Sequence, residues 1–473
     1  MSIVAFSPSR CNNPFQQFSQ SFLDDPELAF AKVLPADVVY ATFQKYDGLQ
    51  INGFYATAIV LWAFISQVLA DGKSATASAA VSRIAAFFAL RGQAVPCSNT
   101  GDYCKARKRL AHEALKELAL LTAKNTETIA SSKWLWKEKH HVKLVDGFTA
   151  TMPDTPENQQ EFPQQPDKNP GCGFPIMRVC IILSLATALI QNAAFGKYQG
   201  KGTGETALLR TMLDSFDTND IVVFDRYYCS YMMIALLVQR GIQVCVRLNA
   251  KRPIDFSSGK RLGKDDQLIT WKRPKRPSWM NVEEYEKIPE TLTLRMVRYS
   301  LVARGRRTLS ITVVTTLVDS DEYSAEDIAE LYGFRWSAEL DIRQVKRSLN
   351  MDHFRCKSPA MVKREFWTTI LGYNLVRKVI CEAAAFSGVL PRRLSFTRTC
   401  AFLLEVSMFW ALTGVQAKSL ESILRHLAKM KVPDRPGRYE PRMVKRRLDK
   451  YPVMKLPRQV LKNDVNLEMT SVQ

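Results

Sequence analysis

Four polar side chains recur along one predicted helix at a spacing that suits phosphoryl-transfer chemistry. They are Tyr332, Arg335, Glu339 and Lys346. At about 100° per residue, all four fall within about 60° of one another on a helical wheel. A carboxylate flanked by cations can hold a divalent metal while the cations bind phosphate. The alternative is a solvated helix face on which Glu339 pairs with Arg343.

Two further carboxylates stand at the ends of predicted buried strands upstream. Asp146 follows the apolar run that begins at Lys143, and Asp225 follows the run Ile221-Val-Val-Phe. Short β-rich apolar runs are typical of strands buried in a parallel sheet. Each Asp alone could also belong to a turn or to a surface ion pair. Two strand-end carboxylates and one helical Glu together predict a metal site.

At these residues the chain resembles a known family, the bacterial insertion-sequence transposases with a DDE triad. It is similar to the insertion-sequence-four type, whose signature is Tyr-x2-Arg-x3-Glu-x6-Lys. The positions that match are Tyr332, Arg335, Glu339 and Lys346, with Asp146 and Asp225 as the family's other two carboxylates. The resemblance extends from about Asn52 to Lys462. Where the family often reads Asp-Gly-Thr-Thr, this chain has Asp146-Gly-Phe-Thr149.

The resemblance implies a catalytic mechanism and its partners. Asp146, Asp225 and Glu339 would hold two Mg²⁺ or Mn²⁺ ions per active site, with Arg335, Lys346 and Tyr332 on the phosphates. The substrate would be double-stranded DNA, both the terminal inverted repeats of an element and the target. Family members excise the element by double-strand cleavage, some of them through a DNA hairpin. They insert it elsewhere as a synaptic homodimer, which is cut-and-paste transposition.

The charge balance favours a nucleic-acid partner. The chain has 473 residues, with 66 Lys and Arg against 46 Asp and Glu, a formal net charge of +20. Such an excess fits a partner of dense negative charge. Ten cysteines without a C-x2-C pair, and no secretory leader, favour a reducing cytoplasm over a disulfide framework or a zinc ribbon. The best apolar runs, 58–70 and 179–190, are too short to span a bilayer, so we expect no membrane segment.

The order of elements predicts an α/β fold with a ribonuclease-H-like catalytic core. We expect strands over 141–148, 176–187 and 189–198, then helix 205–216, strand 221–224, helix 231–240 and strand 243–248. In this order Asp146 lies on the central first strand and Asp225 on its neighbour. The expected domains are a helical N-terminal DNA-binding domain (1–135), the first part of the core (140–250), a β-rich insertion (251–322), the second part of the core with the Glu helix (323–385) and a basic helical or extended C-terminal region (386–473).

Helical periodicity marks the regions on both sides of the core. Helices are expected over 55–70 and 78–90, over 324–349 for the Glu helix, and over 360–385. A basic helix after Ser98 or Thr100, either of which could cap it, groups cations for a phosphate backbone. Its candidates for DNA contact are Lys105, Arg107, Lys108 and Arg109. A solvated helix face is the alternative.

The insertion and the tail add further candidates for DNA contact. Within the insertion we expect strands over 268–272, 292–303 and 309–318. The family's hairpin-forming members carry a β-rich insert here, in which a tryptophan helps to hold a flipped base. Trp271 and Trp279 are the candidates, although a tryptophan in a sheet is more often core. Other candidates are Arg343 on the Glu helix and the tail residues Lys445, Arg446 and Arg447, in a basic, proline-rich stretch that could also be merely solvated.

Three rival functions remain open from the sequence. A metal-dependent nuclease on the same core would cut DNA without joining ends. An inactive DNA-binding descendant of a transposase has no physical reason to keep carboxylates that repel one another without metal. A basic RNA-associated protein fits the charge but not the carboxylates.

Overall fold

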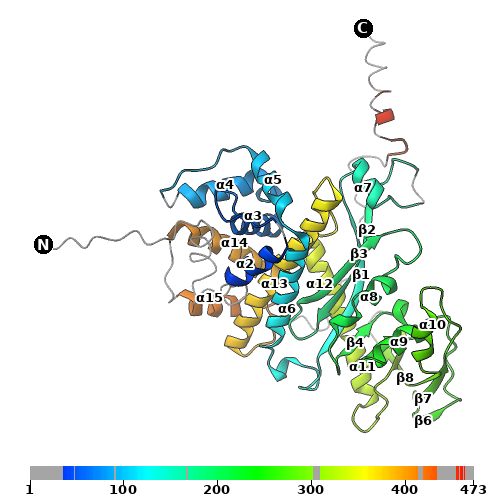
Figure 1. The fold of residues 1–473 in the computed structure, drawn as a ribbon. Helices are drawn as coiled ribbons and strands as arrows, with labels where there is room; N and C mark the ends of the chain where they lie inside the picture. The colour runs from blue at the N-terminus through cyan, green and yellow to red at the C-terminus, as the bar shows by residue number, and fades with distance from the viewer. Residues whose placement is uncertain are drawn as a thin grey trace.

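The computed structural model describes residues 36–46, 48–89, 92–166, 169–301, 309–413, 419–433, 454–457, 459–461 and 463. At its centre is a mixed sheet of nine strands, so the fold is α/β (Figure 1). The strands are β1 (Val142–Thr151), β2 (Ile176–Ser184), β3 (Ile190–Lys197), β4 (Ile221–Phe224), β5 (Gln243–Arg247), β6 (Lys260–Gly263), β7 (Asp266–Lys272), β8 (Thr291–Leu301) and β9 (Leu309–Thr315). Their order across the sheet is β3-β2-β1-β4-β5-β9-β8-β7-β6.

The first five strands lie in the predicted order, but one prediction about them is wrong: Asp146 lies inside β1, which continues to Thr151, and not at the end of its strand. β1 is antiparallel to β2, and β2 and β3 form the expected hairpin. β4 lies next to β1 and parallel to it, and β5 continues the parallel set. All four residues of β4 are buried, as expected for a strand covered on both faces. The predicted strand over 176–187 is too long, because β2 ends at Ser184.

The insertion does not form a separate sheet. Its last strand, β9, pairs antiparallel with β5, and β8, β7 and β6 follow in turn, so the insertion extends the sheet of the first five strands. Three of these strands were predicted, but β6 and the short helix α10 (Val282–Lys287) were not. The region after β1, predicted as loop, contains the short helix α7 (Pro156–Glu161), which Thr155 caps.

Helices cover both faces of the sheet. One face packs against α6, α11, α12 and α13 in a large apolar cluster, and the opposite face packs against α8 and α9 in a second one. These helices are α6 (His112–Glu127), α8 (Glu205–Arg210), α9 (Tyr231–Val238), α11 (Ala325–Gly333), α12 (Arg335–Ser348) and α13 (Pro359–Ser387). The predicted helix over 205–216 is shorter than expected, and a 3-10 turn at Leu213–Ser215 follows it.

The predicted Glu helix is wrong in one respect, because it is two helices. α11 ends at Gly333 and α12 begins at Arg335. Between them the carbonyl of Phe334 accepts a hydrogen bond from the amide of Ser337, three residues later in the chain. An α-helix would instead use the amide four residues later. The break places Tyr332 on α11 and the other three members of its motif on α12. Ser324 does cap α11, as predicted, in a capping box with Asp327.

The remaining helices surround α13 at one side of the sheet. They are α2 (Ala36–Lys45), α3 (Thr57–Leu69), α4 (Ala77–Ala89), α5 (Thr100–Arg109), α14 (Phe396–Thr413) and α15 (Ser419–Ala428). α3, α4 and α13 match the predicted helices closely. The cap of α5 is Asn99, not Ser98 or Thr100. Within the described residues no helix is both long and apolar enough to cross a bilayer.

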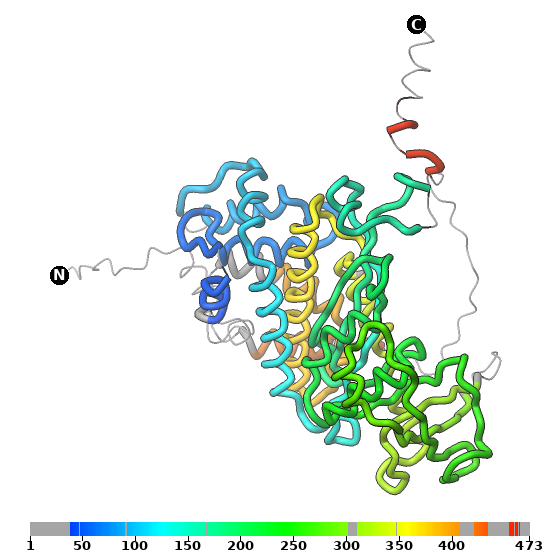
Figure 2. Tube along the Cα trace, turned by 45° about the vertical axis from the view of Figure 1, so that its right-hand side comes forward, coloured from blue at the N-terminus to red at the C-terminus, as the bar shows by residue number. Residues whose placement is uncertain are grey.

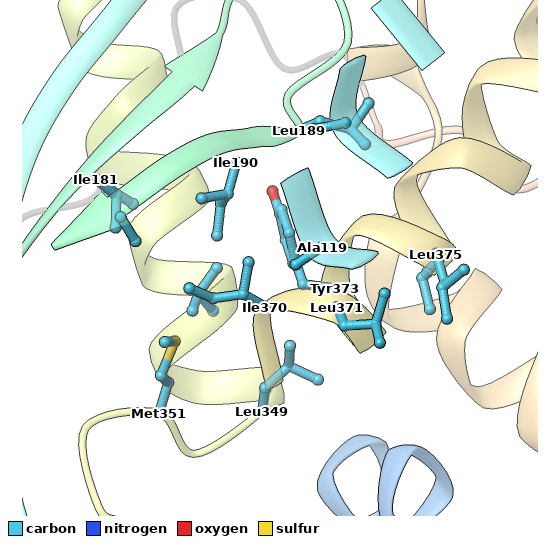
Figure 3. Close-up of a cluster of buried hydrophobic side chains, with 14 of the residues drawn as sticks. Ala119, Ile181, Leu189, Ile190, Leu349, Met351, Ile370, Leu371, Tyr373 and Leu375 are labelled. Atoms are coloured by element: carbon cyan, nitrogen blue, oxygen red, sulfur yellow. The ribbon is translucent and has the colours of Figure 1, made fainter. Parts of the chain in front are cut away.

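The helix α13 joins the N-terminal helices to the sheet. It runs beside α6, as Figures 1 and 2 both show, and it also packs on α3, α14 and α15. Figure 3 shows the contact region, where Ala119 of α6, Ile190 of β3 and Ile370 and Tyr373 of α13 surround one apolar core. The buried amide of Asn374 donates to the carbonyls of Ala119 (3.0 Å) and Ile190 (2.9 Å). A single core therefore holds the N-terminal helices and the catalytic sheet together.

Candidate active site

The two aspartates lie side by side on neighbouring parallel strands. The last paired residues of β1 and β4 are Val145 and Phe224, and Asp146 and Asp225 come directly after them. Neighbouring strands are about 4.8 Å apart, so the two carboxylates start from adjacent positions. By the alternation of side chains, both point to the face that α12 covers, as Leu144 does.

Each aspartate is fixed by a hydrogen bond to its own chain. Asp146 Oδ1 accepts from the amide of Gly147 (2.8 Å). Asp225 Oδ1 accepts from the amide of Arg226 (2.6 Å), where it caps the 3-10 turn Arg226–Tyr228. The second oxygen of each carboxylate is available to a ligand, because these amide bonds orient the side chains without occupying both oxygens.

Glu339 reaches the same place from α12, which packs against β1. Its Oε1 accepts from Arg335 Nη1 at 2.7 Å in an i,i+4 ion pair. The Glu339 side chain is 33% exposed. Arg335 also lies 6.0 Å from the ring centre of Tyr332, across the helix break. Lys346 lies further along α12, with Nζ 5.9 Å from the ring centre of Phe148 on β1.

The charges of Arg335, Glu205 and Glu339 all act on Asp146. Burial raises the pKa of Asp146 to about 6, the charges of Glu205 and Glu339 add to the rise, and Arg335 and the Gly147 amide oppose it. Carboxylates that repel one another in this way are stabilised by a cation.

Tyr332 and Arg335 extend the site towards Asp225. Burial raises the pKa of Tyr332, and the charge of Asp225 adds to that rise, so its hydroxyl is a hydrogen-bond donor at neutral pH. Asp225 also acts on Arg335, whose pKa is raised: burial acts to lower it, but the hydrogen bond to Glu339 and the surrounding charges outweigh burial.

The sequence analysis did not place Glu205 near Asp146, but the structure does. A Cβ placed on Gly147 would lie 2.4 Å from Cδ of Glu205, so the Glu205 carboxyl rests directly on β1 beside Asp146. Tyr228 donates its hydroxyl to Glu205 Oε2 at 3.1 Å. Nothing in the residue spacing links Glu205 to Asp146. The one available signal was Gly147, since a glycine inside a strand often marks a close approach.

The donor set has the chemistry that Mg²⁺ or Mn²⁺ requires, namely carboxylate oxygens. Within the described residues, however, no three His, Cys, Asp or Glu side chains are gathered closely enough to hold an ion in this conformation. One of the three predicted ligands, Glu339, is engaged in the ion pair with Arg335. The residues therefore fit a metal by type, and metal binding would require their side chains to converge.

The basic helix α5 presents some of its cations to solvent and turns one inward. Lys105, Lys108 and Arg109 are exposed. Arg107 instead packs over the rings of Phe64 (4.9 Å) and Tyr103 (5.0 Å). Its environment is that of a packing residue in the N-terminal helices.

The two candidate tryptophans lie in different surroundings. Trp271 on β7 packs against the second apolar cluster, with the guanidinium of Arg252 3.6 Å from its ring centre. Trp279 is 43% exposed, with Arg210 3.9 Å from its ring centre. Trp279 lines a cavity of about 490 Å³ together with Tyr227, two residues after Asp225.

The other candidates for DNA contact complete the set. Arg343 is exposed on α12. The tail residues Lys445, Arg446 and Arg447 lie outside the described residues.

Comparison with known proteins identifies the family. Residues 137–375, about half of the chain, match the family described as "Transposase DDE domain". The chain therefore belongs to the DDE transposases, enzymes that cleave DNA strands and transfer their ends, generally with divalent metals. It is 26% identical over 363 residues to the transposase InsG of insertion sequence element IS4 from Escherichia coli K12, covering 74% of this chain and 77% of that protein.

Two further similarities are more limited. The transposase of insertion sequence element IS421 from Escherichia coli is 34% identical over 74 residues, which is 16% of this chain and 20% of that one. A cryo-EM structure of the piggyBac transposase synaptic complex with hairpin DNA has a TM-score of 0.43 and 8% identity, covering 90% of this chain and 87% of that one.

Proposed function

We propose that this chain is the transposase of an insertion sequence, which cleaves the ends of its element and transfers the 3′-hydroxyl ends to target DNA. The observation that carries the proposal is the placement of Asp146 and Asp225 at adjacent positions of β1 and β4, with Glu339 delivered by the helix that packs on β1. The strand order and the positions of these three carboxylates support a ribonuclease-H-like core.

In the proposed mechanism, Asp146, Asp225 and Glu339 hold two divalent cations. When bound, such ions lower the pKa of the attacking water and stabilise the leaving oxygen. Arg335 binds a phosphate close to the scissile bond, since a guanidinium can bind two phosphate oxygens at once. Tyr332 donates a hydrogen bond to the same backbone, and Lys346 supplies a further cation along α12.

The proposal predicts that variants of the three carboxylates lose DNA cleavage but keep DNA binding. Asp225→Asn or Glu339→Gln removes a ligand charge without changing the shape of the site. We expect Mg²⁺-dependent cleavage of the element end to fall by at least about a hundredfold, because loss of a ligand acts on the chemical step. Binding of the same DNA, measured by gel shift in EDTA, should change little. Lys346→Ala should slow cleavage less than either ligand variant.

Two exposed carboxylates provide matched controls. Asp214 follows α8 and its side chain is 97% exposed, and Glu326 lies on the exposed face of α11. The control variants are Asp214→Asn and Glu326→Gln. Both should cleave like the wild-type protein. Wild-type cleavage by Asp225→Asn would remove that residue from the mechanism. Cleavage by the wild-type protein without any joining to a target duplex would favour a nuclease.

We further propose that Trp279, rather than Trp271, stacks on a base near the cleavage point. Trp279 is exposed beside a cavity that also includes Tyr227, whereas Trp271 is packed into the second apolar cluster. Stacking of a base on an aromatic ring contributes about 1–3 kcal/mol.

A fluorescent base tests the proposed stacking. With 2-aminopurine placed at successive positions of the element end, Trp279→Ala should abolish quenching at one position close to the cleavage point. Trp271→Phe should leave the signal unchanged. Quenching that persists without Trp279 would contradict this assignment.

End recognition is proposed for the exposed face of α5, with Lys105, Lys108 and Arg109 on the phosphate backbone. Their spacing and exposure support this role, and Arg107 is excluded from it by its packing against Phe64. A synaptic homodimer, in which two copies each hold one element end, completes the proposal.

A further inference from the structure

The side chain of Glu205 occupies a position that only a glycine at residue 147 permits. With Cδ 2.4 Å and both carboxylate oxygens 2.7 Å from a Cβ placed there, any larger residue would displace it. Gly147 directly follows Asp146. The Glu205 carboxyl is therefore held against the same strand as the first aspartate, one residue further on.

The open edge of β1 explains how Glu205 approaches from the other face of the sheet. β4 pairs with β1 only as far as Phe224, so β4 does not cover β1 beyond Val145. Gly147 alternates with Asp146 and faces α8, the helix that begins with Glu205. At this open edge, groups from both faces of the sheet come close to Asp146.

Glu205 is also tied to the segment that carries the second aspartate. Its Oε2 accepts the hydroxyl hydrogen of Tyr228 at 3.1 Å. Tyr228 is fully buried and ends the 3-10 turn that Asp225 caps. Glu205 thus contacts both chain segments that supply the two aspartates.

A structural role alone does not account for a charged group at this place. No Lys or Arg in the described residues lies within ion-pair distance of Glu205. Burial raises the pKa of Glu205 and the charge of Asp225 adds to the rise, while the bond from Tyr228 and the charge of Arg178 oppose it. Arg178 itself donates to the carbonyl of Tyr198 and stacks on its ring. A glutamine would accept the same bond from Tyr228 without repelling Asp146 and Asp225. Burying a like charge there is unfavourable unless a cation compensates it.

We infer that Glu205 is a fourth carboxylate of the metal site, facing one of the two cations from the Gly147 side. This inference rests on the proposed function, because it concerns the same ions. Glu205 would complete the ligand set of the ion next to Asp146, either directly or through a metal-bound water. The site would then draw on both faces of the sheet, with Glu339 on one face and Glu205 on the other.

The test measures metal binding on the full-length protein without DNA. Glu205→Gln keeps the size of the side chain and its bond from Tyr228 but removes the charge. Titration with Mn²⁺, followed by electron paramagnetic resonance, should show a loss of affinity of about tenfold or more at one site. The Mg²⁺ concentration that gives half-maximal cleavage should rise by a similar factor. Asp214→Asn should alter neither value.

Two further variants separate a metal role from a structural one. Tyr228→Phe removes the hydrogen bond but keeps the carboxylate, so its effect on Mn²⁺ affinity should be smaller than that of Glu205→Gln. Gly147→Ala displaces the Glu205 carboxyl and should reproduce the Glu205→Gln effect. Thermal unfolding in EDTA should show Glu205→Gln to be at least as stable as the wild-type protein, since a repelling charge has been removed.

The outcomes also distinguish this inference from the proposed function. If Asp225→Asn loses Mn²⁺ binding and cleavage while Glu205→Gln keeps wild-type values for both, Glu205 has no metal role and the transposase proposal stands. If neither variant changes Mn²⁺ binding or cleavage, both proposals are wrong.

Discussion

At the scale of single residues, the proposed active site holds Asp146 in an environment that disfavours its charge. The pKa of Asp146 is raised to about 6 by burial and by its acidic neighbours. Arg335 neutralises Glu339 through their ion pair at 2.7 Å. Binding of a cation would supply the missing positive charge, and Arg335 could then turn to a phosphate. The metal-free protein is therefore expected to lose stability at this site.

This imbalance predicts that Asp146→Asn stabilises the metal-free protein. A carboxyl whose folded pKa lies above its unfolded value imposes no charge penalty below about pH 4. The penalty grows as pH rises towards 6 and is complete above it. In EDTA at pH 7.5, urea unfolding should show Asp146→Asn more stable by about 1–3 kcal/mol. The difference should shrink towards zero near pH 4. A less stable variant at pH 7.5 would contradict this account.

At the scale of elements, a buried acid at the end of α6 anchors the start of β1 and the turn after β2. Glu127 accepts from Ser184 Oγ (2.7 Å), Thr187 Oγ1 (3.1 Å) and Gln191 Nε2 (2.8 Å). Burial acts to raise its pKa, but the bond to His141, the charge of Lys143 and these hydroxyls outweigh burial and lower the pKa to about 2. Lys143 is three residues before Asp146, so this network helps to position the catalytic strand.

The Glu127 network predicts an acid-sensitive contribution to stability. An acid with a lowered folded pKa stabilises the fold above its unfolded pKa, and that contribution is lost as pH falls from about 4.5 towards 2. Glu127→Gln should reduce the free energy of unfolding by about 1–3 kcal/mol at pH 6, measured in urea. Glu117→Gln is the matched control on α6. It removes the charge from a partly exposed pair with Lys45, while a glutamine can still accept from Tyr46, so it should cost less than about 1 kcal/mol. Equal losses in the two variants would exclude the network.

Local patterns predicted the neighbouring positions of the two aspartates but not the contacts across the fold. β4 is a continuous apolar run, so the position of Asp225 directly after it followed from the sequence. β1 continues past Asp146 to Thr151, because Phe148 and Ala150 still pack in the apolar cluster, so the predicted strand end at Asp146 was wrong. The helix break at Phe334 was missed because the apolar spacing of α11 and α12 reads as one helix, although the two pack on different strands. Glu205 and the pairing of β9 with β5 depend on residues far apart in the chain. The inward turn of Arg107 follows from its neighbours Phe64 and Tyr103, which the charge pattern of α5 does not show.

At the scale of the whole molecule, the N-terminal helices and the catalytic sheet are parts of one core. A single apolar cluster extends from Val39 on α2 to Met430 after α15, and α13 runs through it. Movements of the helices that we propose to bind the element end would therefore reach the sheet through α13. The boundary at residue 135 that the sequence predicted remains a prediction, but the packing crosses it.

This shared core predicts that α6 and β3 lose protection from amide hydrogen exchange together when Asn374, which links them, is replaced. Asn374 is fully buried, donates to the carbonyls of Ala119 and Ile190, and accepts from the Ile190 amide (2.9 Å). Asn374→Ala leaves these buried groups without partners, which should cost about 2–4 kcal/mol. Amide hydrogen exchange should then quicken by the same factor in α6 and in β3. Asn125→Ala, on the exposed face of α6, should quicken neither. Faster exchange in α6 alone would show that the N-terminal helices unfold as a separate unit.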